Sequence, residues 1–189
     1  MMRKHAAKTA LLASLTLPAI AFTMQVHAST VVGGAEMSPN KTIVENAIRS
    51  QDHTTLVSAV QAAGLGDTLQ SKGPFTVFAP TNAAFDALPN GTVEQLLQPD
   101  NRDSLRGVLT YHVVPGKITS NALTQKIVQA GGLTELETVA GDRLKAFMEG
   151  GKVVLEDSKG KRSTVTIADV NQANGVIHVI DGVLLPGKA

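Results

Sequence analysis

Residues 174–186 read NGVIHVIDGVLLP, and this stretch decides the fold that the sequence predicts. From Val176 to Ile180 it is almost continuously apolar, which is typical of a strand buried on both faces in the middle of a sheet. Asp181-Gly182 then supplies a turn dipeptide. The sequence therefore predicts a sheet with this strand near its centre.

The chain before this strand alternates with a period of two. Apolar residues alternate over residues 144–148 and again over 153–155, and the pair Gly150-Gly151 lies between the two runs. This arrangement predicts a β-hairpin. We therefore expect the chain beyond Tyr111 to be rich in strands.

The first half shows helical signals instead. Residues 42–45 (TIVE) and 92–95 (TVEQ) each fit a capping box, and Asp100 can open a helix with an apolar face. Residues 75–79 (FTVFA) predict one buried strand between these helices. Residues 90–92 (NGT) are also a formal glycosylation acceptor, which we interpret as part of a cap. Segregated helices and antiparallel strands indicate an α+β domain.

The first 28 residues have the three parts of a cleavable signal peptide. Basic residues precede an apolar stretch at residues 10–22, which is too short to span a bilayer, and residues 26–28 (VHA) suit a cleavage site. We therefore expect an exported protein, periplasmic or extracellular, that begins at Ser29. We expect no membrane insertion after cleavage.

Cleavage also changes the net charge. The whole chain has 17 Lys and Arg against 16 Asp and Glu, a formal charge of +1. Residues 1–28 hold three of the basic residues and no acidic one, so 14 basic residues remain against 16 acidic, a charge of −2. A mildly acidic domain lacks the basic surface that binds nucleic acid or an anionic membrane, so we expect neither as a partner.

The mature chain is expected to have two parts. Residues 29–39 (STVVGGAEMSP) are mostly small, which indicates a flexible leader, and residues 40–187 form the folded domain. The chain has no cysteine, which excludes disulfides and thiolate metal sites. Packing alone must hold the domain together.

Three stretches in order resemble the fasciclin domain family: residues 73–85 (GPFTVFAPTNAAF), 111–116 (YHVVPG) and 174–186. The resemblance covers nearly all of residues 40–187. It implies a wedge-shaped β-sandwich flanked by helices. It also implies an extracellular adhesion or matrix-interaction module with no chemistry of its own.

Tyr111 and His112 are the sharpest candidates for a partner-binding site, because the resemblance places them at a dipeptide that is implicated in adhesion in some animal members of the family. The alternative is structural. Tyr111 would pack at the end of a helix, and His112 would hydrogen-bond a neighbouring loop. The apolar pair Val113-Val114 that follows favours the structural interpretation, because Tyr and His commonly bury one end and keep a polar group bonded.

No catalytic or metal-binding motif stands out in the sequence. The mature histidines are His53, His112 and His178, and their spacing matches no metal motif. We expect His178 to be structural with a satisfied hydrogen bond, and His53 to be solvated at a helix start. The pair Glu156-Asp157 is interpreted as a solvated strand edge. We therefore expect no enzyme, no cofactor and no metal.

Three functions stay open at this point. The first is a secreted adhesion module that contacts a cell-surface or extracellular protein, with self-association or polysaccharide binding as alternatives. Sugar stacking is the weaker alternative, since the chain has no Trp and one Tyr. The second is an envelope protein that holds a small apolar ligand between helices and sheet. The third, which comes last, is a hydrolase with a dispersed acid or histidine site.

Overall fold

The computed structural model describes residues 29–187, so the expected signal peptide lies outside the described residues. The strands are β1 (Thr30–Val32), β2 (Ala35–Met37), β3 (Phe75–Pro80), β4 (Val113–Pro115), β5 (Leu133–Glu137), β6 (Arg143–Glu149), β7 (Lys152–Glu156), β8 (Arg162–Gln172) and β9 (Gly175–Ile180). The helices are α1 (Ile43–Ala47), α2 (Thr54–Ala62), α3 (Gly66–Gln70), α4 (Asn82–Asp86), α5 (Thr92–Leu96), α6 (Arg102–Tyr111) and α7 (Ser120–Gln129). Short 3-10 turns lie at Gln51–His53 and Pro99–Asn101.

The main sheet has the strand order β4-β3-β9-β8-β7-β6-β5. Strand β9 lies between β3 and β8, and all its residues are buried, as the apolar run predicts. The expected antiparallel arrangement is wrong in one place, because β3 and β9 pair in parallel. The long chain between these two strands, with its helices and further strands, supplies the crossover that a parallel pair needs.

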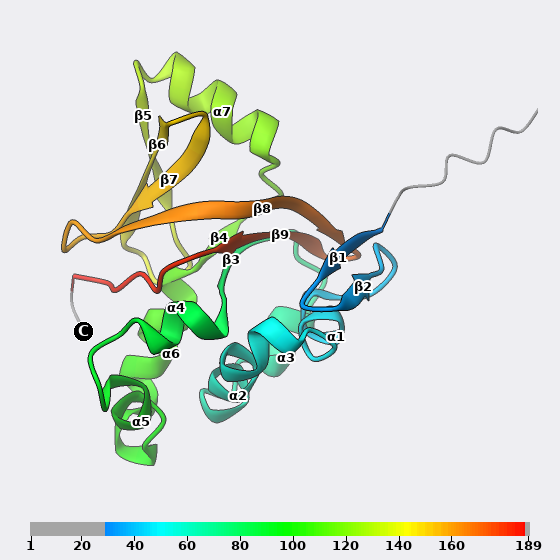
Figure 1. Ribbon diagram of the computed structural model, residues 1–189, viewed down its shortest axis with the longest axis vertical. Coiled ribbons are helices and arrows are strands. Elements are labelled where there is room, and N and C mark those ends of the chain that lie inside the picture. The colour runs from blue at the N-terminus through cyan, green and yellow to red at the C-terminus, as the bar shows by residue number, and fades with distance from the viewer. Residues whose placement is uncertain (1–28, 188–189) are drawn as a thin grey trace, which may run out of the picture.

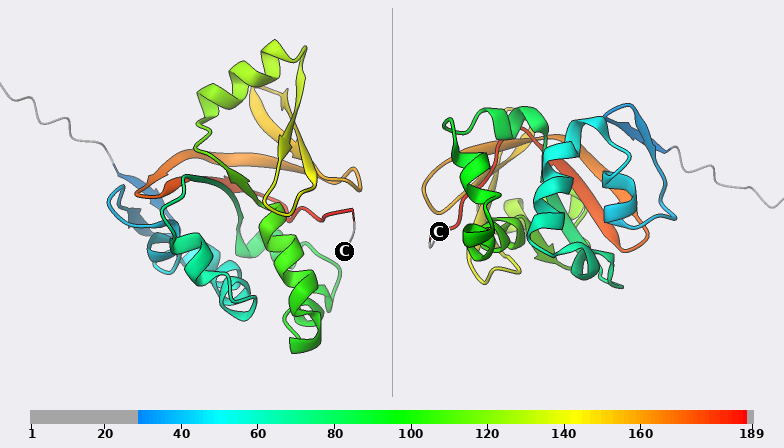
Figure 2. Two further views of the ribbon diagram at one scale, coloured as in Figure 1. Left: turned by 180° about the vertical axis from the view of Figure 1, so that it is seen from behind. Right: turned by 90° about the horizontal axis from the view of Figure 1, so that it is seen from below.

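The two ends of this sheet approach each other. The backbone N–H of Val139, just after β5, donates to the carbonyl oxygen of Val113 in β4 at 2.8 Å. In Figure 1 the long strand β8 and its neighbour β9 cross the middle of the molecule, with β5–β7 and α7 on one side and the other helices opposite. Figure 2 shows the same wedge from behind and from below. The α+β class and the wedge with flanking helices are thus confirmed.

Apolar side chains form two cores, one on each face of β3 and β9. The helix-side core includes Val77 and Val179 and lies against α1–α6, whereas the sheet-side core includes Phe78 and Ile180 and lies against β5–β8 and α7. Successive residues of a strand point to opposite faces, so the same two strands supply both cores.

The prediction of a flexible leader at residues 29–39 is wrong, because β1 and β2 form a hairpin there. Val32 and Met37 are buried in the helix-side core, and the N–H of Gln51 donates to the carbonyl oxygen of Gly33 at 3.0 Å. The small residues that suggested flexibility instead make a tight turn. The folded unit therefore begins about ten residues earlier than expected.

Helix α7 was not predicted, because the chain beyond Tyr111 was expected to hold strands. The hydroxyl of Thr119 accepts a hydrogen bond from the N–H of Ala122 and so caps the start of the helix. Leu123 and Ile127 lie four residues apart on one face and enter the sheet-side core. The helix closes this core on the side of β5 and β6.

The two predicted capping boxes differ in outcome. Thr42 and Glu45 form both hydrogen bonds of the motif at the start of α1. At α5 the N-cap is instead Gly91, with a left-handed backbone and no side-chain cap, so the prediction for residues 92–95 is wrong. Across residues 29–187, the structure holds no helix with the length and apolar character needed to cross a membrane.

Candidate functional site

The pair Tyr111-His112 terminates helix α6. Leu105, Val108 and Leu109 are buried along one face of this helix, as the sequence predicts. The last turn carries Tyr111 to the sheet-side core, while Leu109 belongs to the helix-side core. The pair therefore lies where the two cores meet.

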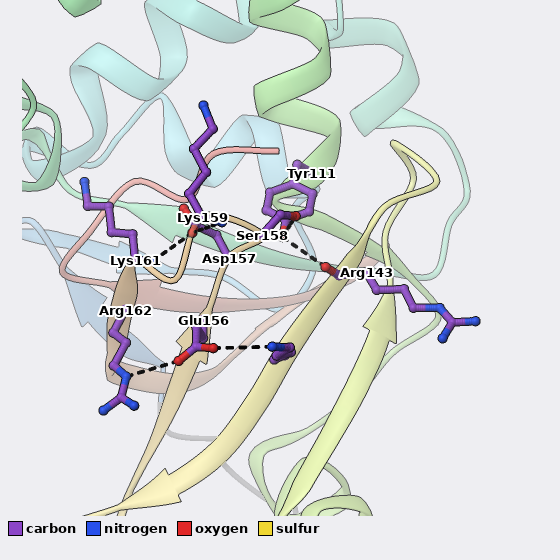
Figure 3. A network of polar contacts seen from close by, with 9 residues as sticks. Tyr111, Arg143, Glu156, Asp157, Ser158, Lys159, Lys161 and Arg162 are labelled. Carbon is purple, nitrogen blue, oxygen red and sulfur yellow. Dashed lines mark hydrogen bonds and ion pairs between the residues drawn. The ribbon is translucent and has the colours of Figure 1, made fainter. Parts of the chain in front are cut away.

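Tyr111 is fully buried, with 0% of its surface exposed. Its hydroxyl donates to the backbone oxygen of Arg143 in β6 at 3.0 Å and lies 3.3 Å from Ser158 Oγ in the β7–β8 turn. Figure 3 shows the ring pointing into this turn. Burial raises the pKa of the Tyr111 phenol, which keeps the hydroxyl protonated as a donor.

His112 is also buried, and both of its ring nitrogens are bonded to backbone atoms. Nδ1 lies 2.8 Å from the oxygen of Val108, and Nε2 accepts from the N–H of Leu184 at 3.0 Å. These partners assign the hydrogen to Nδ1 and leave Nε2 as an acceptor. Burial lowers the pKa of His112 to about 4, so the ring is neutral near pH 7.

Asp157 completes this site, and its interpretation as a solvated strand edge is wrong. The residue is 2% exposed. Its Oδ1 accepts from the N–H groups of Lys159 and Lys161 at 2.9 and 2.8 Å, and its Oδ2 accepts from Leu185 N–H at 2.9 Å. The run Asp157-Ser158-Lys159-Gly160 has the residue types of a turn that an aspartate side chain stabilises. This pattern is the signal that could have identified Asp157 as a turn residue.

His112 and Asp157 hold the segment that follows β9, residues 183–186, which we call the C-terminal strap. His112 bonds to Leu184 and Asp157 to Leu185. Val183 packs in the helix-side core and Leu184 in the sheet-side core. The strap is therefore fixed across the junction of the two cores. Tyr111 does not bond to the strap but to Ser158, next to Asp157 in the β7–β8 turn, and we call Tyr111, His112 and Asp157 the polar clamp.

In this conformation neither Tyr111 nor His112 has a side chain at the surface. Their bonds to β6, the β7–β8 turn and the strap are those of a structural pair. A direct role in partner binding stays a prediction. Any such role in the folded domain has to act through the surface that the clamp positions.

His178 is bonded at both ring nitrogens, as expected for a structural histidine. Nε2 lies 2.8 Å from the oxygen of Ile118, and Nδ1 accepts from Asp169 N–H at 3.3 Å. The ring stacks on Phe78 with centroids 5.6 Å apart. Asp169 has a φ of 58°, and its carboxylate accepts from the N–H of Ser120 at the start of α7. His178 and Asp169 thus anchor the loop that leads into α7.

His53 is buried, so the prediction of a solvated residue is wrong. Its Nδ1 lies 2.9 Å from Ser50 Oγ, and its Nε2 has no hydrogen-bond partner among residues 29–187. The hairpin covers it, because Val32 and Met37 line a small cavity beside the ring. Desolvation lowers the pKa of His53 below its ordinary value.

The helix-side core contains an apolar cavity of about 140 Å³ between α1, α2, α3 and α6. Its wall is almost entirely aliphatic and includes Val44, Ile48, Leu56, Val60, Leu69 and Leu109. His112 also lines the cavity, so the cavity and the polar clamp share one residue. Within residues 29–187, no group of three or more His, Asp or Glu side chains is placed to hold a metal ion.

The model of the fasciclin domain matches residues 51–186. This chain belongs to the fasciclin family. The match covers all three residues of the polar clamp and every strand from β3 to β9. The hairpin and α1 precede the matched residues but pack on the same fasciclin domain through Val32 and Ile43.

Relatives of this fasciclin domain come from distant organisms. "Protein sll1483" of Synechocystis sp. is 51% identical over 158 residues, which cover 84% of this chain and 81% of the relative. "Transforming growth factor-beta-induced protein ig-h3" of Sus scrofa is 38% identical over 131 residues, 69% of this chain but 17% of the relative. A single domain of this chain thus corresponds to a small part of the animal protein.

A solved structure shares the fold. It is a FAS1 domain pair from the insect cell adhesion molecule fasciclin I, with a TM-score of 0.69 and 22% sequence identity. The match covers 78% of this chain and 52% of the pair. At this identity the comparison shows the fold.

Proposed function

We propose that the mature protein is an exported, non-enzymatic interaction module that works by contact with a cell-surface or extracellular protein. The observation that carries this proposal is the fasciclin match over residues 51–186, together with the shared fold of a cell adhesion molecule. The expected signal peptide at residues 1–28 supports a site of action outside the cytoplasm. Self-association and polysaccharide binding are the alternative contacts.

The test uses beads that carry residues 29–189 and measures their adhesion to surface and extracellular material from the producing cells. Saturable adhesion that soluble protein competes away is the expected result. Loss after protease treatment of the cells indicates a protein partner, loss after glycosidase treatment a polysaccharide, and bead–bead aggregation self-association. Adhesion no stronger than that of beads coated with heat-denatured protein would contradict the proposal.

We further propose that Tyr111 and His112 support this contact by holding the C-terminal strap and the β7–β8 turn in place. The support is their complete burial and their backbone partners. In the bead assay, Tyr111→Phe keeps the ring and loses only the hydroxyl bonds. Full adhesion by folded Tyr111→Phe is expected, whereas its loss in a protein with native stability would indicate a direct contact.

A second candidate function is the binding of a small apolar ligand, and the cavity of about 140 Å³ favours it. A cavity of similar size lined by aliphatic and aromatic side chains stays dry and binds benzene in another protein. A neutral ring such as toluene is therefore the probe. A ligand that binds only the native state raises the melting temperature by mass action.

Val60 lines the cavity. Leu155 is the control position, because it belongs to the sheet-side core and lines no described cavity. Val60→Phe is expected to fill part of the space and remove the toluene effect. Leu155→Val keeps the cavity intact and is expected to retain that effect on a less stable protein. The absence of any toluene effect in the unaltered protein would contradict ligand binding and leave the adhesion proposal unaffected.

A further inference from the structure

The chain contains two Asn-Gly dipeptides, Asn90-Gly91 and Asn174-Gly175. Asparagine is among the chemically labile residues of proteins. An asparagine that precedes a glycine reacts most readily. Glycine has no Cβ, so its backbone nitrogen can approach and attack the side-chain carbonyl carbon of the asparagine. The reaction needs a side chain and a backbone that are both free to reach the attacking geometry. The structure places the two dipeptides in opposite situations.

Asn174 is held on every side. Its Nδ2 donates to the oxygens of Leu69 and Ser71 at 2.7 and 2.9 Å, and its Oδ1 accepts from Ile43 N–H at 3.0 Å. Gly175 begins strand β9, and a Cβ on it would lie 2.0 Å from the oxygen of Phe75. Neither the side chain nor the following nitrogen can move without opening the contact between α1, α3 and β3.

Asn90 lies in an exposed turn between α4 and α5. Thr92 N–H donates to the oxygen of Pro89 at 3.0 Å and closes the turn around Asn90 and Gly91. Gly91 has φ 84° and ψ −10°, and a Cβ on it would meet nothing within 4 Å. Within residues 29–187, neither the Asn90 side chain nor the Gly91 amide has a hydrogen-bond partner. The Asn90 side chain and the Gly91 N–H are therefore free to react, although the Gly91 oxygen accepts from Gln95 N–H at 2.9 Å.

We propose that Asn90 is a site of spontaneous deamidation in the native protein, with water as the co-reactant. The Gly91 nitrogen loses its proton and bonds to Cγ of Asn90, the bond from Cγ to Nδ2 breaks, and ammonia leaves with that proton. A cyclic imide results. Water then opens the imide at Cγ to give an aspartate, or at the backbone carbonyl to give an isoaspartate. One ammonia is released and one water is consumed, with no oxidant or reductant.

Each product changes the surface of the α4–α5 turn. Both add a negative charge to an open hollow that Asp86 and Glu94 already line. The isoaspartate also lengthens the backbone inside the turn, which breaks the Thr92–Pro89 hydrogen bond and displaces the N-cap of α5. Because Val93 and Leu96 of α5 pack against the helix-side core, this product loosens one edge of that core.

The experiment incubates the mature protein at 37 °C and mildly alkaline pH, native and in concentrated urea, and follows both asparagines by peptide mass spectrometry. The urea sample gives the intrinsic rate of each dipeptide. In the native sample Asn90 is expected to convert at a rate close to its rate in urea. Asn174 is expected to convert at least about tenfold more slowly than in urea, since it reacts only after local opening.

Asn90→Gln is the matched control. It keeps the amide but lengthens the side chain, and it is expected to abolish the acidic species seen on anion exchange while leaving the melting temperature unchanged. Similar protection of both asparagines in the native protein would overturn the proposal. Conversion of Asn174 at or above the rate of Asn90 would overturn it as well.

Discussion

The large buried side chains of the two cores differ in their exposure. In the sheet-side core Phe78, Tyr111, Leu144, Leu155 and Ile180 have no exposed surface at all. In the helix-side core the leucines are between 4% and 8% exposed, and the apolar cavity lies among them. Most of the large, fully buried side chains thus lie on the sheet side with the polar clamp, and the apolar cavity lies on the helix side.

Two spectroscopic probes follow the two sides separately. Tyr111 is the only tyrosine and the chain has no Trp, so intrinsic fluorescence reports on the sheet-side core. Far-ultraviolet circular dichroism at the helical minimum reports chiefly on α1–α6 beside the helix-side core. Coincident transitions by both probes indicate one cooperative unit, and separate transitions indicate that the cores unfold independently.

The largest effect is expected from Tyr111→Ala. The change removes a fully buried ring from the sheet-side core and both hydroxyl bonds of the clamp, so the free energy of unfolding should fall by about 3–5 kcal/mol. Urea unfolding followed by circular dichroism measures it. A variant that stays as stable as the unaltered protein yet no longer adheres would show that Tyr111 is a contact residue.

A pair of leucine substitutions compares the cores directly. Leu155→Ala creates a new cavity in the tightly packed core and is expected to cost about 3–4 kcal/mol, in the range of buried leucines. Leu56→Ala enlarges the existing cavity, which Leu56 already lines, and should cost about 2 kcal/mol. Denaturant midpoints measure both, and equal costs would contradict the difference in packing.

Acid should weaken the sheet side through His112. The pKa of this ring is about 4 in the folded domain against 6.5 when unfolded, so the unfolded state binds more protons between these values. Its contribution is complete above pH 6.5 and is lost as the pH falls through 4, by roughly 3 kcal/mol in total. The pKa values of His53 and His178 are also lowered by burial and act in the same direction.

Urea midpoints at a series of pH values test this dependence. His112→Gln removes the titrating ring and keeps a polar side chain. The variant is expected to be less stable at pH 7 but to lose less stability between pH 6.5 and 4. A slope equal to that of the unaltered protein would show that His112 does not control the acid response.

The local pattern of apolar residues was sufficient to predict those elements whose burial follows from their own sequence. The apolar run of β9 and the inward face of α6 are such cases, and both are confirmed. The hairpin at residues 29–39 was missed because Val32 and Met37 become core residues only where the turn at Gln51–His53 meets them. Helix α7 was missed because its first turn is polar and only two of its residues, Leu123 and Ile127, are buried.

The site shows the same limit at the level of single side chains. Tyr111 and His112 stand out in the sequence, and the apolar residues after them correctly favour burial. Asp157 does not stand out, because its third partner, the N–H of Leu185, lies 28 residues further along the chain. No periodicity of apolar residues in the local sequence indicates that the strap packs against the β7–β8 turn. The clamp is defined by contacts between distant segments.

The smallest effects separate the clamp from the charges around it. Tyr111→Phe removes a buried hydroxyl donor from the backbone oxygen of Arg143 and should cost about 1 kcal/mol. Arg143→Ala removes an exposed ion pair with Glu135, at 2.8 Å, and should cost less than about 0.5 kcal/mol because solvent screens it. The double variant should show additive costs, since the hydroxyl bonds to the backbone and not to the guanidinium. A larger cost for Arg143→Ala than for Tyr111→Phe would mean that surface charge, rather than the clamp, stabilises the sheet side.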